Sequence, residues 1–410
     1  MADLLKLLVI LALTVVLLMR KWDLGLVLFL DAGLVALLFR YPLGDWVRSV
    51  LGATVAEDTL LLAGAVFLVL TLAELMRRAR ATEDMVQALQ VLVPDNRITV
   101  ALMPLMIGLM PMLGGAMFSA PMVNEVGTPL KMDADRKTFV NYWFRHALEY
   151  VFPLYSSLLM MAALLEVSVF DFISASWPLT LVALLSGMLW GLVGTERGSA
   201  SPGTVGAAQA QEPKRKVWLR LFHGTWPLVL VILSVVVLRL PMVLSLIGVI
   251  ILFAAVKRVG PKQWGPVLKG ALPLHTFTAI FGVMIFKHVM EDAGAVTQIP
   301  AALSTLGLPA MLVAFVVPMI VGLLTGTAAA ALALSVPLVA PLLAGGTMSA
   351  MSAGVWLFVG GFSGVLLSPL HLCLALTKDY FGAGWRGLYQ RIVPSVALVD
   401  LAAAALVLLT

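Results

Sequence analysis

Two apolar segments of the chain carry glycine, proline and serine in the same order. Residues 104–123 begin with Pro-x-x-x-Gly and end with Ser-x-Pro-x-Val, and residues 318–339 repeat both motifs about 215 positions later. Glycine lets a ligand approach the backbone, and serine and threonine hydroxyls both donate and accept hydrogen bonds. Matched Gly and Pro interruptions in the two halves of an apolar chain are typical of a secondary transporter's binding site. The residue types therefore indicate reversible binding of a small solute.

Candidate ligands for this solute lie in the two segments and in the spans that follow them. We expect the first segment to turn at Leu113–Gly114–Gly115–Ala116, and the second to turn at Thr325–Gly326–Thr327. The following spans are interrupted at Pro153 and Pro369, where the missing N–H frees backbone carbonyls. The predicted substrate-binding residues are Gly114, Gly115, Ser119, Ser156, Ser157, Thr325, Gly326, Thr327, Ser368 and His371. Close helix packing is the alternative role for the glycines, and a simple kink is the alternative for the prolines.

Ionisable side chains inside apolar spans are costly, so each one suggests a function. Arg145 and Glu149 are four residues apart, which would put them on one helix face, and with His146 they could form a coupling or proton relay. The alternative is a structural ion pair at the cytoplasmic end of the span. His371 lies far from any loop and is expected to bind the ligand or carry a proton, with a packing role as the alternative. Lys287 is expected to reach the membrane interface.

Other chemistries lack the residues that they require. The chain has no Gly-x-x-x-x-Gly-Lys-Ser/Thr loop for nucleotide phosphates, and no His-x-x-x-His or carboxylate cluster for a catalytic metal. Its single cysteine, Cys373, excludes an intramolecular disulfide and multi-cysteine metal sites. Scattered serines and five histidines do not form a convincing catalytic set. We therefore predict no enzymatic activity, no metal and no cofactor, with Na⁺ or H⁺ as the coupling ion.

The composition is that of a polytopic membrane protein. Apolar residues make up 61% of the 410 residues and charged residues only 12%, against about 25% charged residues in soluble domains. The first apolar stretch has no small-residue cleavage site behind it, so we expect it to be a retained span and not a signal peptide. The net charge is +5, but the basic residues lie in short loops beside apolar stretches. Membrane lipids are therefore expected partners, and nucleic acid is not.

The hydropathy pattern predicts an all-α fold of two repeats, each with five transmembrane helices and one re-entrant hairpin. The repeats would cover residues 1–193 and 218–410, with a cytoplasmic linker at 194–217 and hairpins at about 98–127 and 308–343. The full spans are expected near 3–19, 24–40, 59–76, 139–165, 174–193, 221–239, 241–256, 271–290, 353–377 and 392–409.

The placement of basic residues predicts that the two repeats are inverted. If each hairpin enters and leaves on one face, five crossings per half turn the second half upside down. Under this topology, 21 of the 27 Lys and Arg residues fall on one face, and Arg145 and Lys287 lie within spans. The other face holds only Lys6, Arg40, Arg48 and Arg239. Because cytoplasmic loops carry the basic excess, both termini are expected outside.

An amphipathic stretch precedes the first hairpin. Residues 77–96 place Met85, Ala88, Leu89 and Leu92 on one helical face and charges on the other. We expect an interfacial helix here, and a weaker counterpart at 291–307. An ordinary surface loop is the alternative.

The arrangement resembles the ion transporter superfamily of secondary carriers for gluconate, citrate, dicarboxylates and arsenite. SPLHLCLALTKDYF at 368–381 and GGAMFSAPMVNEVG at 114–127 look like an uncharacterised integral-membrane branch of it. The resemblance implies opposed hairpins, a homodimer and elevator-type movement, with the first two spans of each repeat and the interfacial helices as scaffold and arms. The Ser-Asn-Thr motif of the divalent-anion/sodium symporters is absent from both hairpin tips.

These features together predict a secondary active transporter in a bacterial or archaeal cytoplasmic membrane. It would move a small, anionic, carboxylate-like solute by alternating access, coupled to an ion or proton gradient, as a homodimer. The alternatives are an ion channel, and an intramembrane lipid-processing enzyme or lipid carrier.

Overall fold

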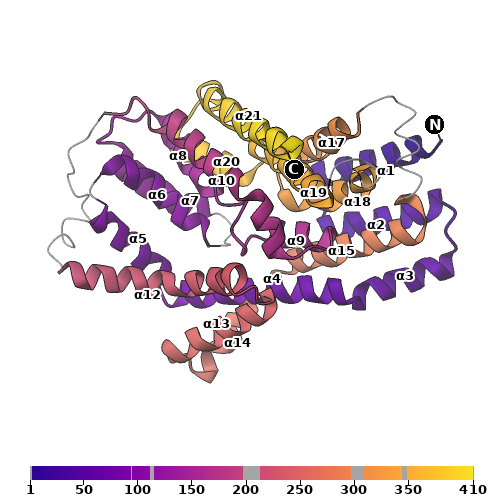
Figure 1. Cartoon of the computed structure of the whole chain (residues 1–410), viewed down its shortest axis with the longest axis horizontal. Coiled ribbons are helices and arrows are strands. Elements are labelled where there is room, and N and C mark those ends of the chain that lie inside the picture. Colours follow the sequence, from indigo (N-terminus) through magenta and orange to yellow (C-terminus); the bar gives the residue numbers. More distant parts are fainter. Residues whose placement is uncertain are drawn as a thin grey trace.

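Helices form all the regular structure of the residues that the computed structural model describes. These residues are 2–93, 95–110, 115–196, 213–296, 309–343 and 349–409. Figure 1 shows helices of very different lengths, several of them interrupted or joined at sharp angles. The all-α prediction is therefore confirmed for this part of the chain.

The first half of the chain has ten described helices, of which α4 and α10 have more than 20 residues. Its helices are α1 Ala2–Met19, α2 Leu24–Leu38, α3 Leu43–Val55, α4 Glu57–Arg78, α5 Ala81–Leu92, α6 Asn96–Gly108, α7 Gly115–Gly127, α8 Ala134–His146, α9 Ser156–Leu164 and α10 Val169–Gly191.

The second half has a similar order of elements. They are α12 Lys214–Ile232, which continues into the π-helix η1 Leu233–Val237, then α13 Met242–Val256, α14 Pro261–Gly270, α15 Leu274–Asp292, α17 Ala310–Thr325, α18 Ala328–Leu343, α19 Ala350–Leu367, α20 Leu372–Phe381 and α21 Trp385–Leu409. The inverted relation between the halves remains a prediction.

Local sequence explains where several helices begin. Asp23, Asp95, Asp133, Ser168 and Ser349 precede α2, α6, α8, α10 and α19, and each side chain accepts a hydrogen bond from a backbone N–H of the first turn. Such N-caps satisfy donors that would otherwise lack a partner.

Long apolar helices make this chain an integral membrane protein. Among the described residues, five helices are long and apolar enough to cross a membrane, or six if α14 and α15, which meet at a 57° bend, count as one span. Hydropathy predicts ten spans, but α2 and α13 have only 15 residues each and therefore measure about 22 Å. The span predicted at 139–165 is divided between α8 and α9. The number of full crossings is thus not fixed by helix length.

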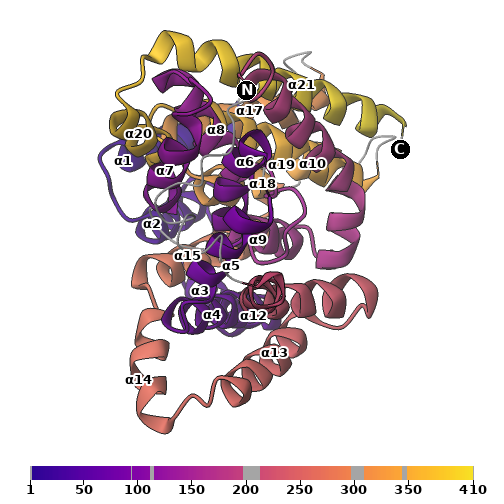
Figure 2. The same ribbon diagram turned by 90° about the vertical axis from the view of Figure 1, so that its left-hand side faces the viewer.

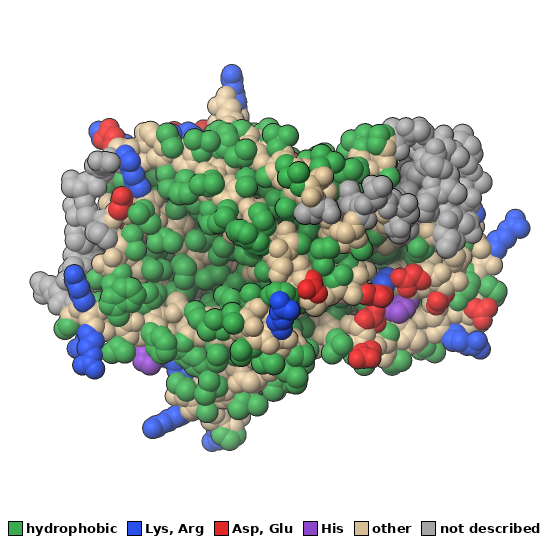
Figure 3. Space-filling view, in the orientation of Figure 1, with side chains coloured by type: hydrophobic (Ala, Val, Ile, Leu, Met, Phe, Trp, Pro, Cys, Tyr) green, Lys and Arg blue, Asp and Glu red, His purple; other side chains and the backbone are tan. Residues whose placement is uncertain are grey.

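The surface fits an apolar environment. Large hydrophobic side chains such as Leu37, Leu51, Leu244 and Leu401 are more than 60% exposed. Figure 3 shows hydrophobic side chains over most of one face, with Lys and Arg mainly at its edges. Exposed apolar area on this scale indicates contact with lipid.

Elements from the two halves of the chain intermingle. Figures 1 and 2 both show α4, α12, α13 and α14 on one side of the molecule and α8, α20 and α21 on the other. Between them, the backbones of α2 and α15 are in direct contact. At Gly25 there is no room for a side chain, since a Cβ would lie 2.0 Å from the Thr278 carbonyl oxygen. Neither half therefore forms a separate folded body.

The amphipathic stretch before the first hairpin is a helix, so the alternative of a surface loop is wrong. Met85 and Ala88 of α5 are fully buried, and α5 packs against α12, where Gly224 lies close to Met85. Most of its predicted counterpart at 291–307, and most of the predicted linker at 194–217, fall outside the described residues. Helix α12 begins at Lys214, inside the predicted linker.

Glycines bring the backbones of α17 and α19 into contact. A Cβ on Gly364 would lie 2.0 Å from the Met319 carbonyl oxygen, and one on Gly322 would lie 2.3 Å from the Gly361 carbonyl oxygen. Small residues allow this close approach, and they are common where membrane helices pack.

We expect Gly364→Ala to separate α17 from α19 and to lower stability by about 1–3 kcal/mol, as overpacked cores do. The measurement is the thermal unfolding midpoint in detergent. Gly248→Ala on α13, where a Cβ would have no neighbour within 4 Å, is the matched control and should leave the midpoint unchanged or raise it. Equal midpoints for the two variants would contradict the packing argument.

Candidate functional site

The second Gly-rich segment forms a tight turn between two helices. Helix α17 ends at Thr325, Gly326 adopts a left-handed φ of +69°, and α18 begins at Ala328. The Gly326 N–H donates to the Gly322 carbonyl at 2.8 Å, and the Thr327 hydroxyl accepts from the Ala330 N–H at 3.4 Å. The tip thus ends one helix and caps the next.

The spans after the two Gly-rich segments are both broken. Helix α8 ends at His146 and α9 begins at Ser156, while α19 ends at Leu367 and α20 begins at Leu372. The Ser368 hydroxyl donates to the Leu323 carbonyl of α17 at 2.6 Å and accepts from the Leu370 N–H at 3.1 Å. The second break is therefore tied to the second hairpin.

His371 joins the break directly to the hairpin tip. Its Nδ1 lies 2.7 Å from the Gly326 carbonyl oxygen. A Cβ on Gly326 would lie 2.7 Å from the Leu370 carbonyl carbon, so only glycine leaves room for this contact. Three predicted site residues, Ser368, His371 and Gly326, are thus brought together.

The two breaks meet at a pair of histidines. The Nε2 atoms of His146 and His371 are 3.2 Å apart, and Nδ1 of His146 lies 2.7 Å from the Tyr142 carbonyl oxygen. Glu149 is buried, and its Oε1 lies 3.8 Å from Nε2 of His146. Because α8 ends at His146, the shared helix face predicted for Arg145 and Glu149 does not exist.

Arg145, in the last turn of α8, places its guanidinium beside Gly115 at the start of α7. Its side chain is buried, and Nη1 donates to the Ile107 carbonyl at 3.2 Å. A Cβ on Gly115 would lie 2.7 Å from Nη1 of Arg145, so glycine makes room for the guanidinium. The Tyr155 hydroxyl donates to the Gly108 carbonyl at 2.6 Å and to that of Arg145 at 3.1 Å. The positive charge of the Arg145 guanidinium therefore lies beside the N-terminus of α7.

The other predicted ligands lie around these contacts. Ser119 is fully buried and donates to the Ala116 carbonyl at 3.3 Å, and Thr325 donates to the Val321 carbonyl at 2.8 Å. Ser157 is buried and Ser156 is exposed, directly after the first break. Gly114 lies outside the described residues.

Two residues of the site are absent from the sequence-based set of ligands. Asn141 is fully buried and donates to the Ala116 carbonyl at 2.9 Å and to the Thr377 hydroxyl at 3.2 Å, which links α7 to α20. Cys373 stands beside both histidines, and its side chain and the two rings offer donor atoms within 4.8 Å of one another. Cys373 follows the second break, which was a usable signal, whereas nothing in the pattern around Asn141 marks it.

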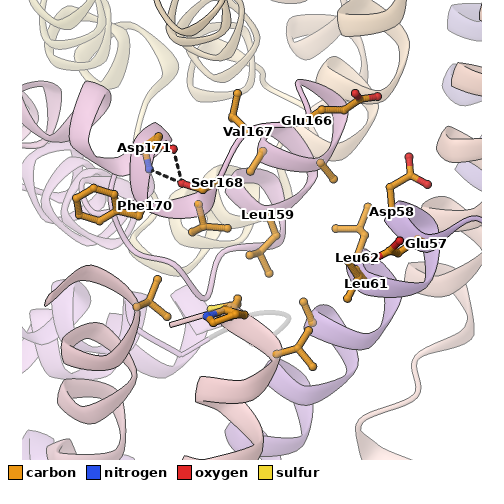
Figure 4. A pocket seen from close by; sticks show the side chains of 18 of the residues that line it. Glu57, Asp58, Leu61, Leu62, Leu159, Glu166, Val167, Ser168, Phe170 and Asp171 are labelled. Carbon is orange, nitrogen blue, oxygen red and sulfur yellow. Dashed lines mark hydrogen bonds between the residues drawn. The ribbon is translucent and has the colours of Figure 1, made fainter. Parts of the chain in front are cut away.

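A cavity of about 950 Å³ lies between α4, α9, α10 and α13, away from these contacts. Figure 4 shows its wall, where Ser168 bonds to Asp171. Its charged lining consists of Glu57, Asp58, Glu166, Asp171 and Arg239, with His288 beside them. This excess of carboxylates would repel an anion, so the cavity is not the predicted anion site.

Lys287 stabilises this region from within the protein. It is 4% exposed, and its Nζ lies 2.7 Å from Glu166 and 3.5 Å from Asp58. Two carboxylates from other elements therefore pair with it, and the location of Lys287 at the membrane interface stays a prediction.

The fold and these contacts define a helical membrane protein with a buried polar site between a Gly-rich hairpin and two broken helices. The chain belongs to the family described as Protein of unknown function (DUF401), which matches residues 2–410. A comparison with curated proteins found no match.

Two solved transporters share the fold. The YdaH transporter of Alcanivorax borkumensis gives a TM-score of 0.62 at 13% identity, covering 96% of this chain and 97% of that chain. MtrF of Neisseria gonorrhoeae, described within a class of antimetabolite efflux pumps, gives 0.54 at 15% identity, covering 89% and 82%. Neither description names a carrier for gluconate, citrate or dicarboxylates, so that narrower resemblance remains a prediction.

We expect Gly326→Ala to move the tip away from His371, because the new Cβ meets both a left-handed φ and the 370–371 backbone. The thermal midpoint in detergent should fall by more than in Gly382→Ala. Gly382 has a φ of +67° but no neighbour within 4 Å, so this control isolates the backbone strain. Equal losses in the two variants would show that the crowding at Gly326 is unimportant.

Proposed function

We propose that this protein is a secondary active transporter of a small, anionic, carboxylate-like solute. The observation that carries the proposal is the contact of the Gly326 tip with His371 at the break between α19 and α20. Interrupted helices deep in a membrane protein are tolerated where they line a site or a cavity, and they are the usual place for a carrier's substrate. The fold shared with two transporters supports this assignment by analogy only.

The preference for an anion rests on the groups around the two tips. The buried guanidinium of Arg145 faces Gly115 at the start of α7, where helix N–H groups also favour negative charge. The hydroxyl of Thr327 is exposed at the second tip and offers a hydrogen bond. These groups suit a carboxylate better than the acidic cavity of Figure 4 does.

Transport would follow an elevator-type cycle in a homodimer. In this proposal α6 to α9 and α17 to α20 move together, because the contacts of Asn141, Ser368 and His371 join them. Helices α1, α2, α12 and α13 would serve as the scaffold. The driving ion would be Na⁺ or H⁺, and the cytoplasmic membrane of a bacterium or archaeon would be the location, with both termini outside.

Reconstituted flux tests the proposal. A thermal-shift screen with carboxylates, phosphates and sugar acids, with and without Na⁺ and at several pH values, selects the compound for uptake. Wild-type proteoliposomes should then show saturable uptake that depends on an imposed Na⁺ or H⁺ gradient. Flux that does not saturate and needs no gradient would favour a channel instead, and turnover of lipid would favour an enzyme.

Thr327→Ala and His371→Ala should reduce uptake to the level of empty liposomes, because each removes a polar group at the tip. Thr327→Ser keeps the hydroxyl that caps α18, and His275→Ala alters an exposed histidine, so both controls should retain uptake. Unchanged uptake in both Thr327→Ala and His371→Ala would refute this site.

Substitution of Arg145 tests whether uptake depends on its positive charge. Arg145→Gln should lower uptake about tenfold or more, since an ionic hydrogen bond is worth roughly 1.5–3 kcal/mol. Arg145→Lys keeps the charge and should retain part of the activity, although it loses the planar fork. If both proteins are monodisperse and transport equally well, the anion does not depend on this charge.

A further inference from the structure

Three potential metal ligands from distant parts of the chain meet at the two helix breaks. His146 is the last residue of α8, His371 precedes α20, and Cys373 lies in the first turn of α20. The two Nε2 atoms are 3.2 Å apart, and the thiol and both rings offer donor atoms within 4.8 Å of one another.

The hydrogen bonds of the two rings fix which ring nitrogens carry hydrogen. Each Nδ1 lies 2.7 Å from a backbone carbonyl oxygen, that of Tyr142 for His146 and that of Gly326 for His371. A carbonyl can only accept, so each Nδ1 must donate. Two neutral rings would then present lone pairs to each other across 3.2 Å. A cation between or beside the Nε2 atoms, either a proton or a metal ion, would remove this repulsion.

The surroundings favour a metal ion over a shared proton. Tetrahedral zinc with Zn–N bonds of 2.0–2.1 Å holds its nitrogen ligands about 3.3 Å apart, close to the separation here. Histidine ligands of metals commonly donate the other ring N–H to a carbonyl, as both rings do. A shared proton needs only two nitrogens, whereas a thiol stands beside both rings as a third soft donor.

Although the sequence predicts no metal, we propose that His146, His371 and Cys373 bind a zinc-class transition-metal ion, with Glu149 supplying the fourth ligand or a balancing charge. Glu149 Oε1 lies 3.8 Å from Nε2 of His146. A divalent ion, one thiolate and one carboxylate sum to zero charge, which suits a buried site. The thiol gives up its proton when it binds the ion.

The site is accessible and joins the two halves of the chain. His146 is only 5% exposed, whereas His371 and Cys373 are partly exposed. His146 and His371 are 225 residues apart, so a bound ion would hold the first break against the second. This proposal does not depend on the transported solute.

Cobalt binding tests the site without any transport assay. Protein purified without a histidine tag and stripped with a chelator is titrated with Co²⁺ in detergent. We expect one Co²⁺ per chain, with thiolate-to-cobalt absorption in the near ultraviolet and the visible bands of tetrahedral cobalt, and displacement by Zn²⁺. Cys373→Ser should abolish the thiolate band, and His371→Ala should weaken binding roughly tenfold or more.

Two exposed histidines provide the controls. His223→Ala and His275→Ala should bind Co²⁺ as the wild type does. Should His146→Ala fail to fold, Cys373→Ser, which barely changes side-chain size, still decides the matter. Absence of stoichiometric binding, or binding that persists unchanged in Cys373→Ser and His371→Ala, would overturn the proposal and leave a shared proton as the explanation of the histidine pair.

Discussion

The structure depends on satisfying the backbone carbonyls at the ends of interrupted helices. The last carbonyls of a helix have no intrahelical partner, and inside a membrane protein water does not reliably replace one. Here side chains from neighbouring helices donate to them. The pairs are Arg145 to Ile107, Tyr155 to Gly108, Ser368 to Leu323, His371 to Gly326, Tyr142 to Leu366 and Tyr389 to Leu367. These donors satisfy carbonyls at the ends of α6, α17 and α19.

This constraint also explains why the polar residues gather at one place. Helices α8 and α19 are broken beside the ends of α6 and α17, and the donors that satisfy those ends come from the last turn of α8 and from the breaks. Arg145 and His371 therefore join the ends of α6 and α17 to the broken spans. Side chains fixed by such contacts lose little freedom when a ligand arrives, which favours binding. Because the two breaks lie side by side, the donor atoms of His146, His371 and Cys373 are within 4.8 Å of one another.

Sequence reasoning worked where the signal was local. Glycine and proline disfavour the continuation of a helix, so Gly326 and the stretches around Pro153 and Pro369 could be identified from the sequence, although α6 and α17 continue through Pro104 and Pro318. It failed where a helix was assumed to continue. Arg145 and Glu149 were given one helical face, yet α8 ends at His146 and Glu149 turns toward that histidine. Residues four apart share a helix face only when the helix continues through both of them.

The sequence by itself determined that the chain is helical and lies in a membrane, because composition and hydropathy are properties of the residues alone. It also indicated the interruptions around Gly326, Pro153 and Pro369, although α8 already ends at His146 and Pro104 and Pro318 lie inside helices. Only the tertiary structure decided which residues meet. The pairing of Lys287 with Glu166, the link from Asn141 to Thr377 and the meeting of His146 with His371 join positions far apart in the chain. Such contacts depend on how helices pack around one another, and no local pattern encodes that.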